Sequence, residues 1–248
     1  MKKRLDQLLV ELGLAPTRQR AKALIMEGKV LIGTTVYSKA GHMVDDSSEI
    51  RLKNPDLPYV SRGGLKLEHA LNVFNVDVKG KIAMDVGAST GGFTDCLLQR
   101  GALRVYAIDV GYGQLALKLR NDTRVIPIER INIRYIDKEM IKDKVDIAVV
   151  DVSFISLKKV IPSVLTVLEG GELICLIKPQ FESKREDISK GGIVKDDAIR
   201  QRAVQEVKAF FEEIALSIIG ICESPIKGQK GNIEFLIYAN CPKTGGRV

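Results

Sequence analysis

Hydrophobic side chains recur at helical spacing near the start of the chain. Four leucines follow the spacing i, i+3, i+4 and i+7 and predict a short helix over residues 4–12. A second helix is expected to begin after Thr17, whose side chain suits an N-terminal cap, and to stop at Gly28. Short apolar runs at 30–32 and 48–52 predict two strands. This part of the chain therefore indicates a small α+β unit.

A different pattern begins further along, where near-continuous apolar runs alternate with segments of helical periodicity. Such runs are typical of parallel strands that helices cover on both faces. The pattern predicts a helix from about residue 65 and a long amphipathic helix at 197–214. The strands are expected at residues 81–86, 104–109, 125–128, 145–151, 172–177 and 216–221, with a hairpin return at 232–238.

Two prolines, Pro55 and Pro58, separate these two patterns. Proline lacks a backbone donor and fixes its own φ, so this stretch is expected to connect domains. We assign residues 1–56 to a first domain, 57–62 to a linker and 63–248 to a second, α/β domain.

The composition points to an acidic partner. Of the 248 residues, 45% are hydrophobic, and the formal net charge is +7, which favours nucleic acid before a membrane surface. Asp6 and Glu11 lie in the N-terminal segment, where a signal peptide would need an uninterrupted apolar region. No apolar stretch approaches the roughly 20 residues of a membrane span. A cytoplasmic protein without stable membrane association is expected, and its oligomeric state stays open.

Neither the histidines nor the cysteines indicate a metal site. The two histidines lie far apart without neighbours at ligand spacing, and no C-x-x-C pair occurs. No metal is therefore expected. Free thiols of a reducing compartment are predicted at Cys96, Cys175, Cys222 and Cys241.

Residues 81–94 have the pattern of a buried strand, a glycine turn and the start of a helix. An open α/β sheet binds its ligand at such a turn. Ser89 stands where a dinucleotide fingerprint needs its second glycine, and Phe93 stands where a P-loop needs lysine, so both phosphate-binding interpretations are weakened. One unit later Asp109 ends a second strand, where a carboxylate suits the two hydroxyls of a ribose.

Together the turn and the second acid resemble the S-adenosylmethionine (SAM) site of Rossmann-like methyltransferases. The resemblance implies SAM as cofactor and a Rossmann-like fold for the second domain. The cofactor-binding residues that it implies are Asp85, Gly87, Ala88, Ser89, Gly91, Gly92, Phe93, Asp109, Val110 and Asn132.

Four ionisable residues near predicted strand ends have no simple packing explanation. Asp151 and Lys178 close neighbouring parallel strands. Glu234 is expected within an apolar strand, where a bare carboxylate is costly, and Lys66 points away from the apolar face of its helix. Salt bridges would explain any one of them, but beside a SAM turn the neutral set favours catalysis.

The chemistry of this set suits methyl transfer to a hydroxyl, whose proton must be removed as the new bond forms. A lysine that is flanked by another cation and shielded from water loses affinity for its proton, so Lys178 beside Lys66 is a candidate base. The two carboxylates would then orient the lysines.

The set resembles the lysine–aspartate–lysine–glutamate tetrad of FtsJ-like ribose 2′-O-methyltransferases. With the motifs at 61–67, 85–95 and 178–182, the chain resembles the TlyA family, also labelled hemolysin A. This likeness implies methyl transfer to cytidine riboses of 16S and 23S ribosomal RNA, with ribosomal RNA or ribosomal subunits as partner; which subunit is modified stays open. The catalytic residues that it implies are Lys66, Asp151, Lys178 and Glu234.

The first 55 residues resemble the S4 RNA-binding domain. The likeness rests on residues 4–10, 17–25 and 28–30, with Thr17 where that family usually has serine. It implies charge-assisted contacts to the RNA backbone. The RNA-binding residues expected are Arg4, Arg18, Arg20 and Lys22, together with Arg62 of the linker.

Other functions compete with this interpretation. Asp151 is not followed by the two prolines typical of base amino methylation, and Cys241-Pro242 reverses the order that cytosine C5 chemistry uses. The remaining alternative is a membrane-active hemolysin or a non-catalytic RNA-binding protein. The lack of a strongly apolar amphipathic helix speaks against lysis, and the complete tetrad speaks against a silent site.

Overall fold

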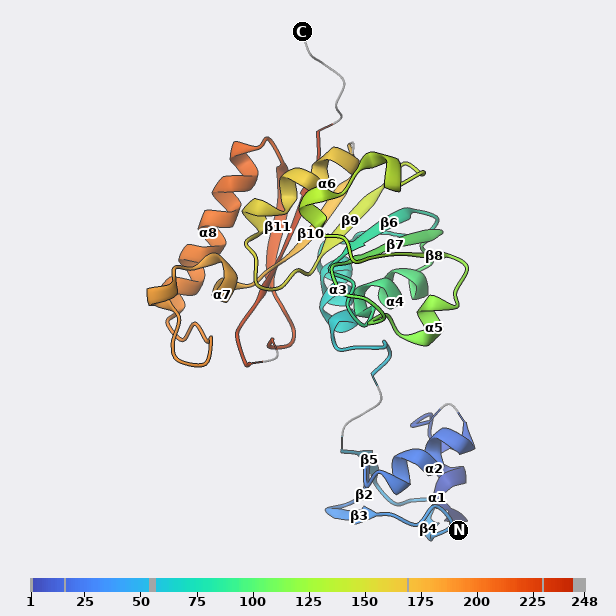
Figure 1. Cartoon of the computed structure of the whole chain (residues 1–248). Helices are drawn as coiled ribbons and strands as arrows, with labels where there is room; N and C mark the ends of the chain where they lie inside the picture. The colour runs from blue at the N-terminus through green and yellow to red at the C-terminus, as the bar shows by residue number, and fades with distance from the viewer. Residues whose placement is uncertain (1, 16, 54–56, 169, 229, 243–248) are drawn as a thin grey trace. The chain divides into compact units, whose positions relative to one another are not determined.

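Two compact units make up the structure. Figure 1 shows the computed structural model, which describes residues 2–15, 17–53, 57–168, 170–228 and 230–242. One unit is Met1–Pro58 and the other is Tyr59–Val248, so that the division falls inside the stretch 57–62.

The N-terminal unit packs two helices and several short strands around one core. Its elements are β1 (Lys2–Arg4), α1 (Leu5–Glu11), α2 (Arg18–Met26), β2 (Val30–Ile32), β3 (Thr35–Tyr37), β4 (Met43–Asp45) and β5 (Ile50–Leu52). β1 pairs with β4, and β2 lies between β3 and β5. Thr17 caps α2 by accepting a hydrogen bond from the backbone N–H of Arg20 at 3.2 Å.

Both predicted helices of this unit are confirmed, because their apolar faces supply the core. Leu5 and Leu9 of α1 and Leu24 of α2 are fully buried there. The strands β1, β3 and β4 lie outside the predicted strand ranges, because most of their positions are exposed and they contain no buried apolar run.

The C-terminal unit is built on one seven-stranded sheet in the order β11-β12-β10-β9-β6-β7-β8. The five strands from β10 to β8 in this order run parallel, and β12 lies antiparallel between β10 and β11. The predicted fold class, a Rossmann-like α/β sheet, is confirmed. Its strands are β6 (Ile82–Val86), β7 (Arg104–Asp109), β8 (Val125–Glu129), β9 (Ile147–Val150), β10 (Glu172–Ile177), β11 (Ser217–Glu223) and β12 (Phe235–Asn240).

Helices cover both faces of this sheet (Figure 1). Met84 and Val86 of β6 pack in one cluster with α6 and α8, and Ala83, which points to the other face, packs with α3 and α4. The α-helices are α3 (Gly63–Val73), α4 (Gly92–Gln99), α5 (Leu117–Arg120), α6 (Ile161–Val167), α7 (Pro179–Glu182) and α8 (Asp197–Glu213). Short 3₁₀ turns are η1 (Ile133–Tyr135), η2 (Lys138–Met140), η3 (Leu157–Lys159) and η4 (Arg185–Asp187).

One predicted placement is wrong. Glu234 does not lie within a strand, because β12 begins at the next residue, Phe235. Since β12 runs antiparallel to β10, the start of β12 meets the carboxyl end of β10, as the pairing of Phe235 with Ile177 shows. Glu234 therefore reaches the same edge of the sheet as the loops that follow the parallel strands.

Two other sequence features concern membranes and thiols. No helix in the described part of the chain has both the length and the apolar character that a membrane span needs. All four cysteines are free thiols, as predicted. Burial raises the pKa of the Cys96 thiol to about 12 and that of Cys241 to about 11, so neither thiol is prone to ionise.

Candidate active site

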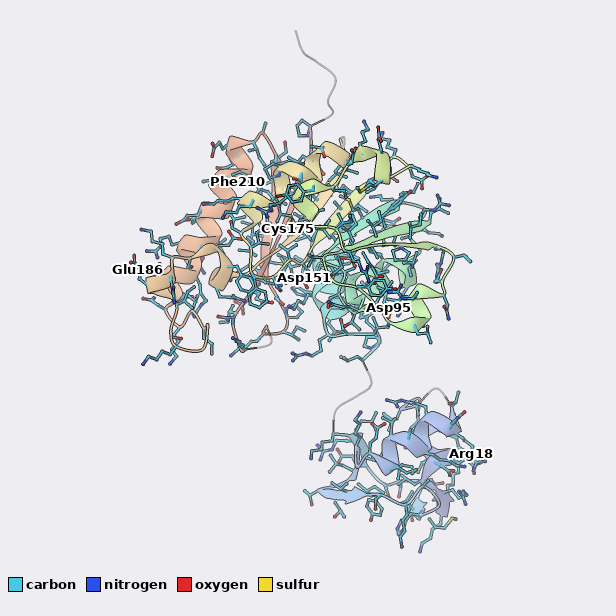
Figure 2. The ribbon with its side chains drawn as sticks, in the orientation of Figure 1. Arg18, Asp95, Asp151, Cys175, Glu186 and Phe210 are labelled. Carbon is cyan, nitrogen blue, oxygen red and sulfur yellow. The ribbon has the colours of Figure 1, made fainter. Side chains whose placement is uncertain are left out.

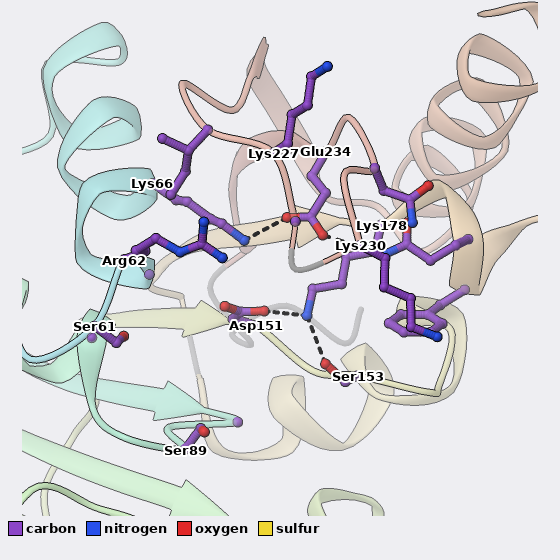
Figure 3. Close-up of a pocket in the computed structure, with 18 of the residues that line it drawn as sticks. Ser61, Arg62, Lys66, Ser89, Asp151, Ser153, Lys178, Lys227, Lys230 and Glu234 are labelled. Carbon is purple, nitrogen blue, oxygen red and sulfur yellow. Dashed lines mark hydrogen bonds and ion pairs between the residues drawn. The ribbon is translucent and has the colours of Figure 1, made fainter. Parts of the chain in front are cut away.

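A cavity of about 530 Å³ opens at the carboxyl edge of the parallel strands (Figure 3). Its walls come from the start of α3, the glycine turn after β6, the loops after β9 and β10, and the loop between β11 and β12. An open α/β sheet holds its ligand in this position.

Two lysine–carboxylate pairs lie side by side in this cavity (Figure 3). The Nζ atom of Lys66 is 2.6 Å from Oε2 of Glu234, and the Nζ atom of Lys178 is 2.6 Å from Oδ1 of Asp151. The side chains of both lysines are only 9% exposed, and that of Glu234 is 3% exposed. The structure thus brings the four predicted charges together, although Lys66 and Glu234 are 168 residues apart in the sequence.

Each of these side chains is placed by the end of an element. Asp151 follows β9, and Lys178 follows β10 and precedes Pro179, which starts α7. Lys66 projects from α3, whose apolar residues Leu67 and Leu71 face the core. The position of each residue in its element therefore places a charged side chain at the edge of the sheet.

Three further polar residues of the cavity are not among the predicted site residues. Ser153 accepts a hydrogen bond from Nζ of Lys178 at 3.0 Å, and Gln180 donates from Nε2 to Oε1 of Glu234 at 3.4 Å. Asn232 is 3% exposed. Single uncharged residues in loops carry no periodicity, so no sequence signal pointed to them.

Asn232 joins two loops that border the cavity. Its Oδ1 accepts from the backbone N–H of Val194 at 2.9 Å, and its Nδ2 donates to the carbonyl of Gly192 at 2.8 Å. Gly228 lies directly on Glu234, because a Cβ at that glycine would come within 2.3 Å of Oε1. The basic loop between β11 and β12 is therefore held against the charged set.

The glycine turn approaches the same set from the other side. Gly87 has a φ of +87°, and a Cβ there would lie 2.5 Å from the main-chain oxygen of Asp151. A Cβ on Gly92 would lie 2.2 Å from Oγ of Ser61. Only glycine permits this close packing of the turn against the loop after β9 and the start of α3.

The predicted cofactor residues divide into two groups. Gly87, Ala88, Ser89, Gly92 and Phe93 line the cavity, as do Lys66, Asp151, Lys178, Glu234 and Arg62. The second group, which lies outside the lining, is Asp85, Gly91, Asp109, Val110 and Asn132.

Asp109 is hydrogen-bonded to the glycine turn. Its Oδ2 accepts from the backbone N–H of Ser89 at 2.8 Å, and its Oδ1 accepts from that of Gly111 at 2.7 Å. Val110 is exposed, and Asn132 caps η1 by accepting from the backbone N–H of Arg134 at 3.1 Å.

Asp85 is fully buried beneath the turn. Its Oδ2 accepts hydrogen bonds from the backbone N–H of Thr94 at 2.9 Å and from Oγ1 of Thr94 at 2.6 Å. Its Oδ1 has no hydrogen-bond partner in the described part of the chain. Burial raises the pKa of this carboxyl to about 7, against the opposing effect of Thr94.

The expected RNA-binding residues of the N-terminal unit are exposed to different degrees. Arg4 and Arg18 both contact Asp6, whose side chain is fully buried, at 3.0 Å and 3.1 Å. The hydrogen bond from Arg4 is the main cause that lowers the pKa of Asp6. Arg20 lies 3.6 Å from Glu27, and Lys22 is exposed. Asp6 therefore fixes the direction of two arginines while leaving about half of each side chain exposed.

Arg18 in the N-terminal unit and Asp151 in the C-terminal unit are both labelled in Figure 2.

Among the described residues, no group of three or more His, Cys, Asp or Glu side chains is arranged to hold a metal ion.

Comparisons with known proteins agree with this architecture. The sequence pattern of FtsJ-like methyltransferases matches residues 59–241, and that of the S4 domain matches residues 3–50. A Bacillus subtilis protein, YqxC, provisionally named an rRNA methyltransferase, is 47% identical over 98% of this chain and 88% of its own length. The 16S/23S rRNA (cytidine-2′-O)-methyltransferase TlyA of Mycobacterium tuberculosis is 42% identical over 95% of this chain and 88% of its own.

A solved structure gives the same result. A Streptococcus thermophilus protein, provisionally named a hemolysin, is 45% identical to this chain and superimposes with a TM-score of 0.75. The match covers 97% of this chain and 89% of that protein's chain. The chain therefore belongs to the FtsJ-like methyltransferase family, in the S4-containing group that includes TlyA.

Proposed function

We propose that the protein transfers a methyl group from SAM to the ribose 2′-hydroxyl of cytidine in 16S or 23S ribosomal RNA. The observation that carries this proposal is the pair of buried lysine–carboxylate contacts in a cavity that the glycine turn also lines. The name of the Mycobacterium tuberculosis relative supports the choice of acceptor.

The residues around the turn fit a nucleoside with a charged tail. The N–H groups of Gly92 and Phe93, the first two of α4, have no acceptor within the helix, which makes this end a favourable place for a carboxylate. Each oxygen of Asp109 has one backbone donor in the contacts described above, which leaves a lone pair for a ribose hydroxyl. Bound SAM would supply an electrophilic methyl group on its sulfonium.

Lys178 is the candidate base. Its side chain lines the cavity, is 9% exposed and is paired with Asp151, so its amine can meet the acceptor hydroxyl with little competing water. In its neutral form the amine takes the hydroxyl proton as the new C–O bond forms. The second pair, Lys66 with Glu234, would hold the ribose hydroxyl in place, and its own two charges cancel.

The rim of the cavity suits a phosphodiester strand. Arg62, Lys227 and Lys230 border it, are exposed, and form no ion pair within the described parts of the chain. Together with the basic face of the S4 domain, they favour RNA as the substrate.

The test is methyl transfer from labelled SAM to 30S and 50S subunits that lack the modification, with the product mapped by ribose-sensitive primer extension. Lys178→Ala should lower the rate at least about 100-fold, because general base catalysis contributes this much. Lys208→Ala, at a partly exposed lysine of α8 that pairs with Glu212, is the matched control and should leave the rate unchanged.

A 2′-O-methyl stop in the product of the wild-type protein, lost with Lys178→Ala, would establish the reaction and its base. Label on a base instead of a ribose would overturn the proposed acceptor. Undiminished transfer by Lys178→Ala would overturn the role of this lysine.

A further inference from the structure

We propose that Ser153 is a positioning residue, which directs the lone pair of the Lys178 amine into the cavity. The proposal rests on the function proposed above, in which Lys178 acts as the base.

The geometry around Lys178 is the starting point. Two oxygen atoms approach its Nζ: Oδ1 of Asp151 at 2.6 Å and Oγ of Ser153 at 3.0 Å (Figure 3). Both oxygens belong to the loop after β9, whereas the lysine follows β10. The loop therefore presents two acceptors to one amine from a neighbouring strand.

A neutral amine has two N–H donors and one lone pair, and an ammonium has three N–H donors and none. When Asp151 and Ser153 each take one N–H, the lone pair of the neutral amine must occupy the third position. Because Lys178 lines the cavity, this position is the one left to face the substrate.

The proton balance of the step fits this arrangement. As the hydroxyl oxygen forms its bond to the methyl carbon, the carbon–sulfur bond breaks and the O–H proton passes to Nζ. The new N–H forms where the lone pair stood, so neither the hydrogen bond to Ser153 nor the ion-pair contact with Asp151 has to rearrange. The product ammonium then returns its extra proton to solvent.

Asp151 alone would not select this orientation. With a single acceptor, the amine can rotate about its Cε–Nζ bond and place the lone pair in either of two positions. Ser153 removes this choice.

The loop conformation supports a specific role for Ser153. The next residue, Phe154, has a φ of +64°, which is unfavourable for a bulky side chain. Its ring lies 5.2 Å from that of Phe181 in α7, so the loop that carries Ser153 packs against the element that follows Lys178.

The experiment compares Ser153→Ala, Ser153→Thr and Ser156→Ala in the full-length protein. Ser153→Ala should lower kcat about 10-fold, with KM for the subunit and the Kd for SAM within about 2-fold of wild type. Ser153→Thr restores the hydroxyl and should return kcat to within about 3-fold of wild type.

Ser156→Ala is the matched control, because Ser156 lies in the same connection but touches Glu182 and not Lys178. The value of kcat is calculated per protein molecule that binds SAM, so that a smaller folded fraction does not lower it. Ser156→Ala should change kcat less than Ser153→Ala does, even where it lowers the melting temperature more.

Two results would overturn the inference while leaving the proposed function intact. One is a kcat of Ser153→Ala within about 2-fold of an active wild type; the other is a Ser153→Thr variant as slow as Ser153→Ala. A wild-type protein that forms no ribose methyl product would instead overturn the proposed function, and this inference with it.

Discussion

At the scale of single residues, the site depends on charges that are buried together. The side chains of Lys66 and Glu234 are almost fully removed from water, and each would be costly without the other. Asp85 is different, because Thr94 satisfies only one of its oxygens and its pKa is raised to about 7 by burial. This carboxyl makes the stability of the protein depend on pH.

The sign of this dependence follows from the raised pKa. Between the ordinary value of 3.8 and about 7, the folded protein holds a proton on Asp85 that the unfolded chain releases. The free energy of unfolding should therefore fall as the pH rises through this range, by at most roughly 4 kcal/mol, and this contribution should level off above pH 7.

Chemical denaturation of the wild type and Asp85→Asn at several pH values between 4 and 8 measures this contribution. The asparagine has no such titration, so its curve should be flatter by the stated amount. Parallel curves for the two proteins would show that Asp85 does not titrate in this range.

At the scale of elements, one carboxylate ties two parts of the site together. Oε2 of Glu182, the last residue of α7, accepts from Oγ of Ser156 at 2.5 Å, and Oε1 accepts from the backbone N–H of Leu157 at 2.8 Å. These two donors belong to the start of η3. Glu182 therefore sets the spacing between the loop after β9 and the helix after Lys178.

Glu182→Ala should lower the free energy of unfolding by about 2 kcal/mol, because both donors lose their acceptor. Glu182→Gln should stay close to wild type: its oxygen can accept from Leu157, and its amide can donate to the Ser156 hydroxyl. Burial raises the pKa of Glu182, which means that the site disfavours the negative charge. Burial of the neutral glutamine should therefore cost no more than burial of the ionised glutamate.

Thermal or urea unfolding of the two variants, together with methyl transfer, tests this bridge. A Glu182→Gln variant as unstable as Glu182→Ala would mean that the negative charge, and not the pair of hydrogen bonds, holds the two elements together.

At the scale of the whole molecule, the two units divide the work. All of the described residues that line the cavity belong to the unit Tyr59–Val248, and the S4 match lies within Met1–Pro58. Binding of SAM and binding of RNA should therefore be separable.

Removal of residues 1–54 should weaken binding of ribosomal RNA at least about 10-fold, because it removes the cationic face of the S4 domain. The Kd for SAM should stay within about 2-fold of that of the full chain. Calorimetry with SAM and fluorescence anisotropy with labelled RNA measure the two quantities. An equal loss of SAM affinity would contradict the division of labour.

The local pattern of the sequence determined most helices and strands of this protein, and also the edge of the sheet at which the site lies. The sequence shows the strand ends, the glycine turn and the charged residues beside them. The carboxyl ends of parallel strands meet at one edge of the sheet whatever connects the strands, so these residues are expected to lie together. The membership of Asp151 and Lys178 in one site follows from this rule, whereas Lys66 belongs to helix α3.

Tertiary structure alone decided which groups meet there. The partners of Lys66 and Lys178, the acceptor Ser153, and the bridges made by Asn232 and Glu182 join segments far apart in the chain. Single polar residues in loops have no period, and the antiparallel return of β12, which brings Glu234 to the edge, depends on the pairing of strands. A sequence pattern records the element to which a residue belongs, whereas a contact depends on how elements pack.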